Sequence, residues 1–391
     1  MSDVPPLRFP EFSGEWKKCT IKDYGEVVTG NTPPTSNPEY YDNGSYLWAS
    51  PADLGINKNI TDTKTKLSLS GFRKTRNIPK GSVLITCIGS TIGKMGMATE
   101  TMSSNQQINS IVINDKSDSD FVYYAISRAF PRYLSEVGIQ AVPILSKSNF
   151  EKLPNYTTCR EEQDKIGYFL NLLDERIATQ NKIIEDLKKL KSAIIDYAIN
   201  SLDTDFAKFG SLYETAGEGG TPTTSNTSFY DNGKIPFVKI DDLKQKYLTE
   251  NKDFITELGL QKSSAWLVPT RSILFSNGAS IGEITITTYP VCTKQGILGI
   301  VPKSNIDVEF LYYFMSSTYF KKAISRIVTE GTMKTVYLKD INNILCPIPT
   351  KEKQQGIAKM PSDLNSKIDY EQSLLKLFIM QKQYLLRQMF I

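Results

Sequence analysis

The sequence predicts an α+β protein made of two copies of one unit, each a globular α+β domain followed by a long helix. Two observations lead to this fold class. A long amphipathic stretch at residues 160–200 recurs at residues 351–391, and a series of short motifs recurs in the same order in the two halves. Such an internal duplication defines the organisation of a chain before any single motif is interpreted. We expect a first domain at 1–158, a helix at 159–200, a second domain at 201–350 and a helix at 351–391.

The first long helix follows from apolar periodicity. Residues 160–200 contain no proline, and their apolar residues follow the 4-3 spacing that places side chains on one helical stripe. About 40 residues at about 1.5 Å each make a rod of roughly 60 Å. Such a rod needs a partner helix to cover its stripe. The seam residues expected on this helix are Ile166, Leu170, Leu173, Ile177, Ile184, Leu187 and Ile194.

The partner is expected within the same chain. Residues 351–391 align on the first helix with a constant shift, 354 − 163 = 191, and the seam is matched by Leu364, Ile368, Leu375, Phe378 and Leu385. Polar residues interrupt both stripes at the same places, Gln180 with Glu371 and Lys191 with Lys382. Polar seam residues can set the register of a coiled coil, and we interpret these four in that way.

Pro361 is the main departure between the two helical stretches. Proline inside a helix removes a hydrogen bond and costs roughly 3 kcal/mol. The sequence Met-Pro-Ser-Asp-Leu suits a helix that stops and restarts with proline in its first turn. We therefore expect a kink or a short break near Met360.

The two domains repeat with a shift of 221 − 32 = 189 residues, measured from Thr32 to Thr221. Asp-Asn-Gly at 42–44 and 231–233 predicts a tight turn, because glycine supplies the positive φ. Apolar and β-branched runs predict strands at 46–48, 82–88, 95–99 and 108–113, and at 235–238, 272–275, 284–286 and 297–301. Helices are expected at 121–132 and 308–325, with a linker at 201–210. Each domain is interpreted as α+β with a mostly antiparallel sheet.

Composition excludes several kinds of chemistry. The 391 residues carry a formal net charge of +4 and include no histidine. Histidine-based nucleophilic, acid–base and metal-binding machinery is therefore excluded. The net charge alone does not identify a nucleic-acid binder, although a local basic patch could. No apolar run is long enough for a membrane span, so we expect a cytoplasmic protein.

Two motifs suggest catalysis but are better explained as turns. Asn-Pro-Glu-Tyr at 37–40 lacks the second proline of an adenine-methyltransferase motif, and its repeat counterpart is Asn-Thr-Ser-Phe at 226–229. Gly-Ser-Thr-Ile-Gly-Lys at 89–94 has three residues between its glycines, where a P-loop has four, and its counterpart has glutamate in place of the lysine. The first motif lacks a residue, and the second lacks the spacing, that its chemistry requires.

A basic stretch at residues 58–80 suggests DNA contact, because serine, threonine and asparagine lie between its lysines and arginines and suit phosphates and base edges. The alternative is a loop solvated by lysine. The candidate DNA-binding residues of the first domain are Lys58, Lys64, Lys66, Arg73, Lys74, Arg76, Ser90, Thr91, Lys94, Asn105, Gln106 and Gln107. Those of the second are Lys239, Lys244, Asn277, Ser280, Lys294, Gln295 and Lys334.

The full set of repeated motifs resembles the specificity subunit of type I restriction–modification systems. The motifs are Gly-Asn-Thr-Pro (30–33) with Gly-Gly-Thr-Pro (219–222), both Asp-Asn-Gly turns, Ile-Pro-Lys-Gly-x-Val-Leu (78–84), both Ile-Gly pairs (92–93, 281–282), Asn-Gln-Gln (105–107) with Lys-Gln-Gly (294–296), and Glu-Glu-Gln-x-Lys-Ile (161–166) with Glu-Lys-Gln-Gln-Gly-Ile (352–357). The resemblance implies two target-recognition domains, each reading one half of a split DNA sequence. It also implies that the helices form an intramolecular antiparallel coiled coil that sets the spacing.

The resemblance further implies the partners. These are double-stranded DNA, two methyltransferase subunits that modify adenine, and two motor-nuclease restriction subunits, with no membrane. S-adenosylmethionine, ATP and Mg²⁺ would bind those subunits, whereas this chain would bind no cofactor or metal and carry no catalysis. Two alternatives stay open: a stand-alone DNA-modifying enzyme, and a coiled-coil scaffold without DNA readout.

Overall fold

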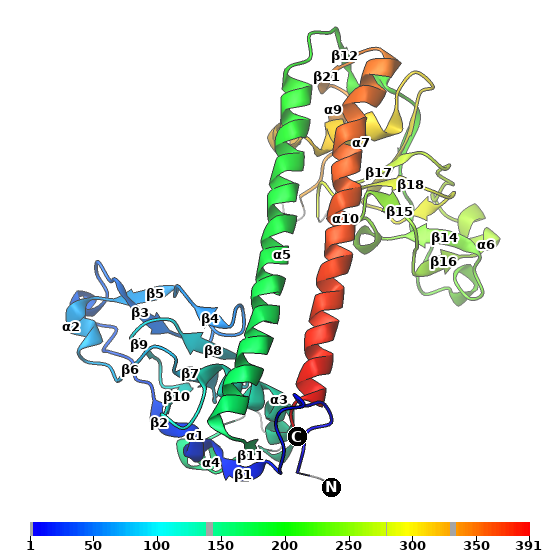
Figure 1. Cartoon of the computed structure of the whole chain (residues 1–391). Coiled ribbons are helices and arrows are strands. Elements are labelled where there is room, and N and C mark those ends of the chain that lie inside the picture. The colour runs from blue at the N-terminus through cyan, green and yellow to red at the C-terminus, as the bar shows by residue number, and fades with distance from the viewer. Residues whose placement is uncertain (1–2, 138–143, 279, 329–333) are drawn as a thin grey trace. The chain divides into compact units, whose positions relative to one another are not determined.

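The computed structural model describes residues 3–137, 144–278, 280–328 and 334–391. It divides into two compact units (Figure 1). Unit 1 comprises Met1–Lys182 with Ser373–Ile391, and unit 2 comprises Ile183–Gln372. Each unit therefore combines one globular domain with part of both long helices. The boundaries of the four expected segments stay a prediction, because the units divide within the helices.

The two long helices are α5 (Arg160–Asn200) and α10 (Lys351–Gln388). Helix α10 runs through Pro361 without interruption, so the predicted short break near Met360 is wrong. Tertiary contacts explain this outcome. Ser362, the next residue, accepts a hydrogen bond from Lys246 and donates one to Glu309. These contacts hold the helical turn at Pro361 in place, although proline removes one backbone hydrogen bond from that turn.

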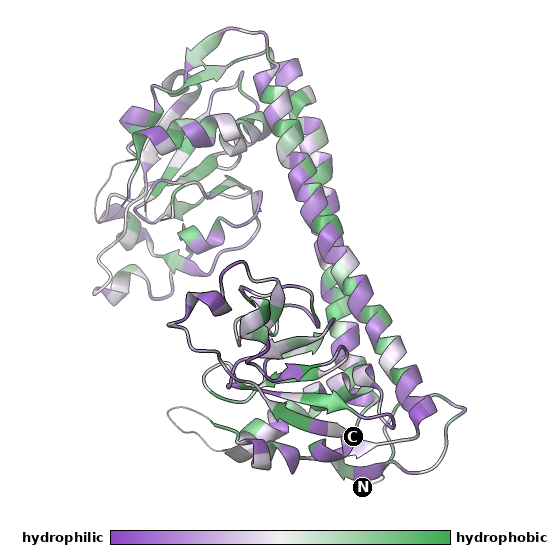
Figure 2. Ribbon diagram, turned by 90° about the vertical axis from the view of Figure 1, so that its left-hand side faces the viewer, coloured by the Kyte–Doolittle hydropathy of each residue, from purple (hydrophilic) through white to green (hydrophobic). Residues whose placement is uncertain are grey.

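Within each unit the two helices pack antiparallel, and hydrophobic and hydrophilic residues alternate along both (Figure 2). In unit 1, Leu170 and Leu173 share one core with Leu385. In unit 2, Ile195 and Ile199 share a core with Ala358. All twelve predicted seam residues are buried or half-buried. The two seam residues nearest the start of α5, Ile166 and Leu170, lie in the core of the first domain. The apolar stripe of α5 therefore begins inside that domain.

The first domain contains two main sheets. Among its described residues, one sheet has the order β2-β10-β7-β8-β4 and the other has the order β5-β3-β9-β6. The pairs β4·β8 and β3·β9 are parallel, and the others are antiparallel. The strands are β2 (Gly25–Thr29), β3 (Tyr46–Ala49), β4 (Asn59–Ile60), β5 (Thr65–Leu67), β6 (Asn77–Ile78), β7 (Val83–Thr86), β8 (Met95–Ala98), β9 (Met102–Ser104) and β10 (Ile108–Ile113).

The second domain repeats this plan. Its described residues form one sheet ordered β13-β20-β17-β18-β15 and another ordered β16-β14-β19. The parallel pairs β15·β18 and β14·β19 match those of the first domain. The strands are β13 (Tyr213–Glu218), β14 (Ile235–Val238), β15 (Tyr247–Leu248), β16 (Asp253–Ile255), β17 (Ile273–Ser276), β18 (Ile284–Thr287), β19 (Cys292–Thr293) and β20 (Ile297–Pro302). The predicted mostly antiparallel α+β domains are confirmed.

Each domain also contains a short two-stranded ladder that the sequence did not predict, and this ladder lies beside the start of the long helix. Strand β1 (Lys17–Thr20) pairs with β11 (Pro154–Thr157), just before α5. Strand β12 (Phe206–Lys208) pairs with β21 (Leu345–Pro347), just before α10. The predicted linker at 201–210 therefore contributes a strand, and both ends of each domain are tied together at the start of a long helix.

The shorter helices show one clear difference between the domains. Helix α3 (Ser119–Val137) is continuous in the first domain, whereas the single helix predicted at 308–325 is two helices, α7 (Val308–Ser316) and α8 (Thr318–Ile327). The prediction failed because Ser317 accepts a hydrogen bond from the backbone of Phe320 and caps a new helix. The remaining helices are α1 (Ile21–Tyr24), α2 (Leu69–Phe72), α4 (Lys147–Glu151), α6 (Glu257–Gln261), α9 (Leu338–Ile341) and 3₁₀ turns at Pro38–Tyr40, Phe209–Ser211, Thr227–Phe229 and Ile240–Asp242.

Candidate nucleic-acid interface

Three loops of the first domain are held together by the Gly-Asn-Thr-Pro motif. The Asn31 side chain donates to the carbonyl of Lys74 (2.9 Å) and accepts from the amide of Arg76 (2.8 Å). Thr32 donates to the side chain of Gln106 (2.5 Å). The motif thus joins the loop that carries Arg73, Lys74 and Arg76 to the loop that carries Gln106, and all four side chains are exposed. Exposed arginine, lysine and glutamine on adjoining loops can contact phosphates and base edges.

Glycine is required at the start of this motif by a close backbone approach. A Cβ added to Gly30 would lie 2.2 Å from the carbonyl oxygen of Ser104. In the second domain a Cβ on Gly219 would lie 2.2 Å from the carbonyl oxygen of Thr293. Both domains therefore use glycine to bring the motif against the Asn-Gln-Gln or Lys-Gln-Gly loop.

The second domain has a similar surface with less positive charge. The backbone N–H of Gln295 donates to the Thr221 hydroxyl (3.3 Å), so the motif again contacts the glutamine loop. The residues aligned with Arg73–Arg76 are Lys262, Ser263, Ser264 and Ala265, by the shift 262 − 73 = 189. Ser280, Lys294, Gln295 and Lys334 are exposed. The two domains consequently present different side chains on equivalent loops.

Three candidates from the sequence lie away from any open surface and are removed from the interface. Asn105 is 9% exposed, and its side chain accepts from the Gln107 amide (3.0 Å). Asn277 is 2% exposed and donates to the carbonyl of Val336 (3.1 Å). The Lys58 side chain is 6% exposed and is ion-paired with Asp120 at 2.5 Å. Their residue types suit DNA, but each of these side chains is bonded to a partner within the protein.

The other candidates lie at or near the surface. Three of them form exposed ion pairs, Lys66 with Asp62 (2.9 Å), Lys239 with Asp253 (2.8 Å) and Lys244 with Asp241 (3.4 Å). Exposed pairs contribute about 1 kcal/mol or less, so these lysines can exchange a carboxylate for a phosphate. Lys64, Ser90 and Lys94 are exposed, whereas Thr91 and Gln107 are half-buried.

The motif Glu-Glu-Gln (161–163) or Glu-Lys-Gln (352–354) stands at the start of each long helix. Its glutamine links the helix to the domain by hydrogen bonds. Gln163 is 2% exposed, accepts from the amide of Asp118 (3.0 Å) and donates to the carbonyl of Thr158 (2.8 Å). Gln354 is 1% exposed and makes the same two contacts, with the amide of Asp307 (2.7 Å) and the carbonyl of Pro349 (2.9 Å). Both contacts are structural, and they explain why the motif recurs where α5 and α10 begin.

The residue just before this glutamine differs between the two copies of the motif, because only unit 1 contains the N-terminal segment that contacts it. Glu162 is fully buried and accepts two hydrogen bonds from the Arg8 guanidinium, at 2.6 and 2.8 Å. A bidentate arginine–carboxylate pair is among the stronger polar contacts in proteins. Its counterpart in the second copy, Lys353, is exposed. The change from Glu-Glu-Gln to Glu-Lys-Gln therefore follows from the local partner.

A buried lysine links each domain to a long helix, and we call the two arrangements the Lys58 network and the Lys246 network. In the first, the Lys58 amine contacts Asp120, Asn171 (2.7 Å) and the Tyr124 hydroxyl (3.2 Å). In the second, the Lys246 amine contacts Glu309 (2.7 Å) and Ser362 (2.8 Å). Asn171 and Ser362 belong to α5 and α10, whereas the other partners belong to the domains.

The Lys246 network predicts a stability effect at acidic pH. Burial raises the pKa of Glu309, but hydrogen bonds from Lys246, Tyr247 and Ser362 outweigh it and bring the pKa down to about 2. A carboxyl group with a lowered pKa stabilises the fold above its unfolded pKa of about 4.5 and loses that contribution as the pH falls towards 2. The difference in melting temperature between wild type and Glu309→Gln should therefore shrink from pH 5 to pH 3. A difference that stays constant over this range would contradict the assignment.

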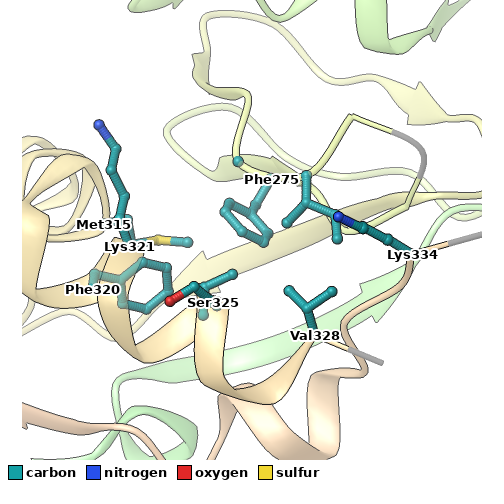
Figure 3. Close-up of a pocket in the computed structure, with 10 residues that line it drawn as sticks. Phe275, Met315, Phe320, Lys321, Ser325, Val328 and Lys334 are labelled. Atoms are coloured by element: carbon teal, nitrogen blue, oxygen red, sulfur yellow. The ribbon is translucent and has the colours of Figure 1, made fainter. Parts of the chain in front are cut away.

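A pocket in the second domain is lined by residues of β17, α7 and α8 (Figure 3). It has a volume of about 510 Å³ and is lined in part by Phe275, Gly282, Met315 and Phe320. In the first domain Phe130 covers the equivalent glycine, because a Cβ on Gly93 would lie 2.8 Å from that ring. A Cβ on Gly282 would meet no described atom within 4 Å. The described parts of the two domains therefore differ beside this glycine: Phe130 of α3 covers Gly93, whereas Gly282 lines the pocket.

No helix within the described residues is long and apolar enough to cross a membrane. The described part of the chain likewise contains no cluster of cysteine, aspartate and glutamate that could hold a metal ion.

The repeated domains with paired helices define a family. The family model for the type I restriction modification DNA specificity domain matches residues 13–189 and 203–377, and the chain belongs to this family. The chain is 27% identical to the type I restriction enzyme MjaIX specificity subunit of Methanocaldococcus jannaschii, over 90% of this chain and 88% of the relative.

Two solved structures share the fold. One is the S subunit of a type I restriction–modification system from M. genitalium, 19% identical, with a TM-score of 0.61 and 99% of each chain covered. The other comes from a study of complex assembly and conformational transition in the type I R-M system. It is 14% identical, with a TM-score of 0.62, and covers 97% of this chain and 98% of that one.

Proposed function

We propose that this chain is the DNA sequence-specificity subunit of a type I restriction–modification complex, in which each domain reads one half of a bipartite, interrupted sequence. The observation that carries the proposal is the repeated polar surface in which a Thr-Pro motif clamps a glutamine-bearing loop. An internally duplicated chain can match the approximate dyad of duplex DNA. Family membership supports the same role.

The chemistry of the two surfaces suits different half-sites. Arg73, Lys74 and Arg76 give the first domain a basic edge for phosphates or guanines, and Gln106 suits adenine. The second domain presents Lys262, Ser263 and Ser264 at the aligned positions, with Gln295 on the equivalent loop. Because the side chains differ, the two halves of the recognised sequence should differ as well.

The helices dock the partner subunits in this proposal and set the spacing of the half-sites. Each unit exposes apolar side chains in one row along a long helix: Leu377, Met380 and Tyr384 in unit 1, and Ile183, Leu190 and Tyr197 in unit 2. Exposed apolar patches mark interaction sites. Two methyltransferase subunits that modify adenine occupy these rows, and two restriction subunits join the full complex. S-adenosylmethionine, ATP and Mg²⁺ bind those partners, and this chain contributes no catalytic group.

The proposal predicts that the two half-sites can be changed independently. Replacing residues 58–110 with the same segment of another family member should change one half of the methylated sequence and leave the other half intact. Mapping methylated adenines in cells with the wild-type chain, with the chimera and without either chain measures this result. Simultaneous change of both halves would contradict the two-domain assignment.

Two further outcomes would overturn the function itself. Methylation or cleavage of DNA by the purified chain alone would indicate a stand-alone enzyme. A methyltransferase complex that discriminates no DNA sequence would indicate a scaffold. Sequence-specific binding by the complex should also weaken steeply as salt rises, because phosphate contacts release counterions.

A further inference from the structure

The Lys58 and Lys246 networks connect the central sheet of each domain to a long helix through a single side chain. The carbonyl of Lys58 accepts from the amide of Met97 on β8 (2.7 Å), and its amine reaches Asn171 on α5 (2.7 Å). The carbonyl of Lys246 accepts from the amide of Ile286 on β18 (2.8 Å), and its amine reaches Ser362 on α10 (2.8 Å). The backbone of each lysine is therefore hydrogen-bonded to a strand of the sheet, and its amine reaches the helix.

Both lysines are buried, and their partners match the donors that an ammonium group offers. The side chains are 6% and 3% exposed. The Lys58 amine uses its three donors on Asp120, Asn171 and Tyr124. The Lys246 amine pairs with Glu309 and Ser362 and lies 4.9 Å from the centre of the Tyr313 ring. Burying a cation is costly unless its donors are satisfied. A rotation of the domain on the helix would keep the ion pair but would remove the helix partner, Asn171 or Ser362, and leave one N–H donor of the buried ammonium without its acceptor.

The same arrangement has been kept in both copies although the surrounding loops differ. The shifts are 246 − 58 = 188 for the lysine, 309 − 120 = 189 for its carboxylate, 313 − 124 = 189 for its tyrosine and 362 − 171 = 191 for its helix partner. The lysine shift differs by one from that of the domain, so the aligned residue at 247 is tyrosine. Two loops of different length thus deliver a lysine to the same place, which argues for a shared role.

We propose that Lys58 and Lys246 are positioning residues that fix the orientation of each recognition domain on its helix and thereby restrict the complex to one spacer length between the half-sites. The inference rests on the proposed function. Neither lysine touches DNA in this role. Each limits how far the reading loops can swing relative to the helix, so that only half-sites at one separation and rotation around the duplex are engaged together.

The test is methylation by the purified complex of this chain with its methyltransferase, using duplexes in which the unread spacer is shortened or lengthened by one base pair. Wild type should prefer one spacer strongly. In Lys58→Met and in Lys246→Met, the preference should fall by about tenfold or more while the bases required in each half stay unchanged. Lys147→Met, which alters an exposed ion pair in the first domain, is the matched control and should keep the wild-type preference.

A purely structural role gives a different result. Loss of stability would lower methylation of all spacer variants by the same factor, and an unchanged ratio between spacers would overturn the inference. Asn171→Leu provides a second route if a lysine variant fails to fold, because it removes the helix partner and leaves the Lys58–Asp120 pair in place. It should relax spacer preference in the same direction, and combining it with Lys58→Met should add little.

The proposed function fails separately from this inference. If wild type shows no preference for any sequence, the specificity role itself is wrong. If wild type requires defined bases in both halves and Lys58→Met, Lys246→Met and Asn171→Leu all keep its spacer preference, the specificity role stands and the positioning role is rejected.

Discussion

Replacing Leu377, Met380 and Tyr384 together with aspartate should abolish docking of a methyltransferase subunit on unit 1. These side chains are 58%, 54% and 56% exposed, and their i, i+3, i+7 spacing places them on one face of α10. Exposed aspartate costs the free chain little, whereas charge buried in an apolar interface is strongly unfavourable. We expect assembly to weaken by at least about 100-fold, or about 2.7 kcal/mol.

Mass photometry or analytical gel filtration of the chain with its methyltransferase measures this effect, and the melting temperature of the free chain should stay near that of wild type. Gln381 and Gln383 lie on the same helix and are exposed polar residues. The pair Gln381→Asp and Gln383→Asp is therefore the matched control and should assemble normally. Normal assembly of the apolar triple variant would place the docking surface elsewhere.

The features that sequence reasoning found are those encoded by local periodicity and by duplication. The 4-3 spacing predicted α5 because a helical stripe depends only on neighbouring turns, and the constant shift of 191 residues identified its partner. The polar positions on the seam were also visible. Lys191 donates to Asn365 (2.9 Å) and Lys382 donates to Asp174, so two interruptions of the apolar stripe meet polar partners on the opposite helix.

The features that the sequence did not predict depend on contacts between residues that are far apart along the chain. Lys58 lies in a basic stretch and has the composition of a DNA contact, but its helix partner Asn171 is 113 residues away. Nothing local distinguishes it from the exposed lysines nearby. The ladders β1·β11 and β12·β21 are equally non-local. The break at Ser317 had a local signal, because serine is a favoured N-cap, but the apolar residues on both sides suggested one helix.

Lys382→Met should destabilise the protein and Lys191→Met should not, although the two lysines occupy equivalent positions on the seam. Lys382 donates to Asp174, whose side chain is 18% exposed and also accepts from the Tyr124 hydroxyl (2.6 Å). Removing Lys382 leaves this carboxylate in a mostly buried site without its cation, which costs roughly 3 kcal/mol. Unit 1 should therefore unfold at a lower denaturant concentration.

Lys191 faces a neutral partner, Asn365, and burial lowers the pKa of its amine. A lysine with a lowered pKa is held as a cation at a cost to the folded state, so Lys191→Met removes that cost and leaves an amide that still bonds Asp369 (3.1 Å). Unit 2 should be unchanged or slightly more stable. Denaturant unfolding followed by hydrogen exchange in each unit separates the two effects. Equal destabilisation by both variants would contradict this prediction and show that register depends on the lysines themselves, whereas destabilisation by Lys382→Met alone assigns the specificity of the seam to the Lys382–Asp174 ion pair.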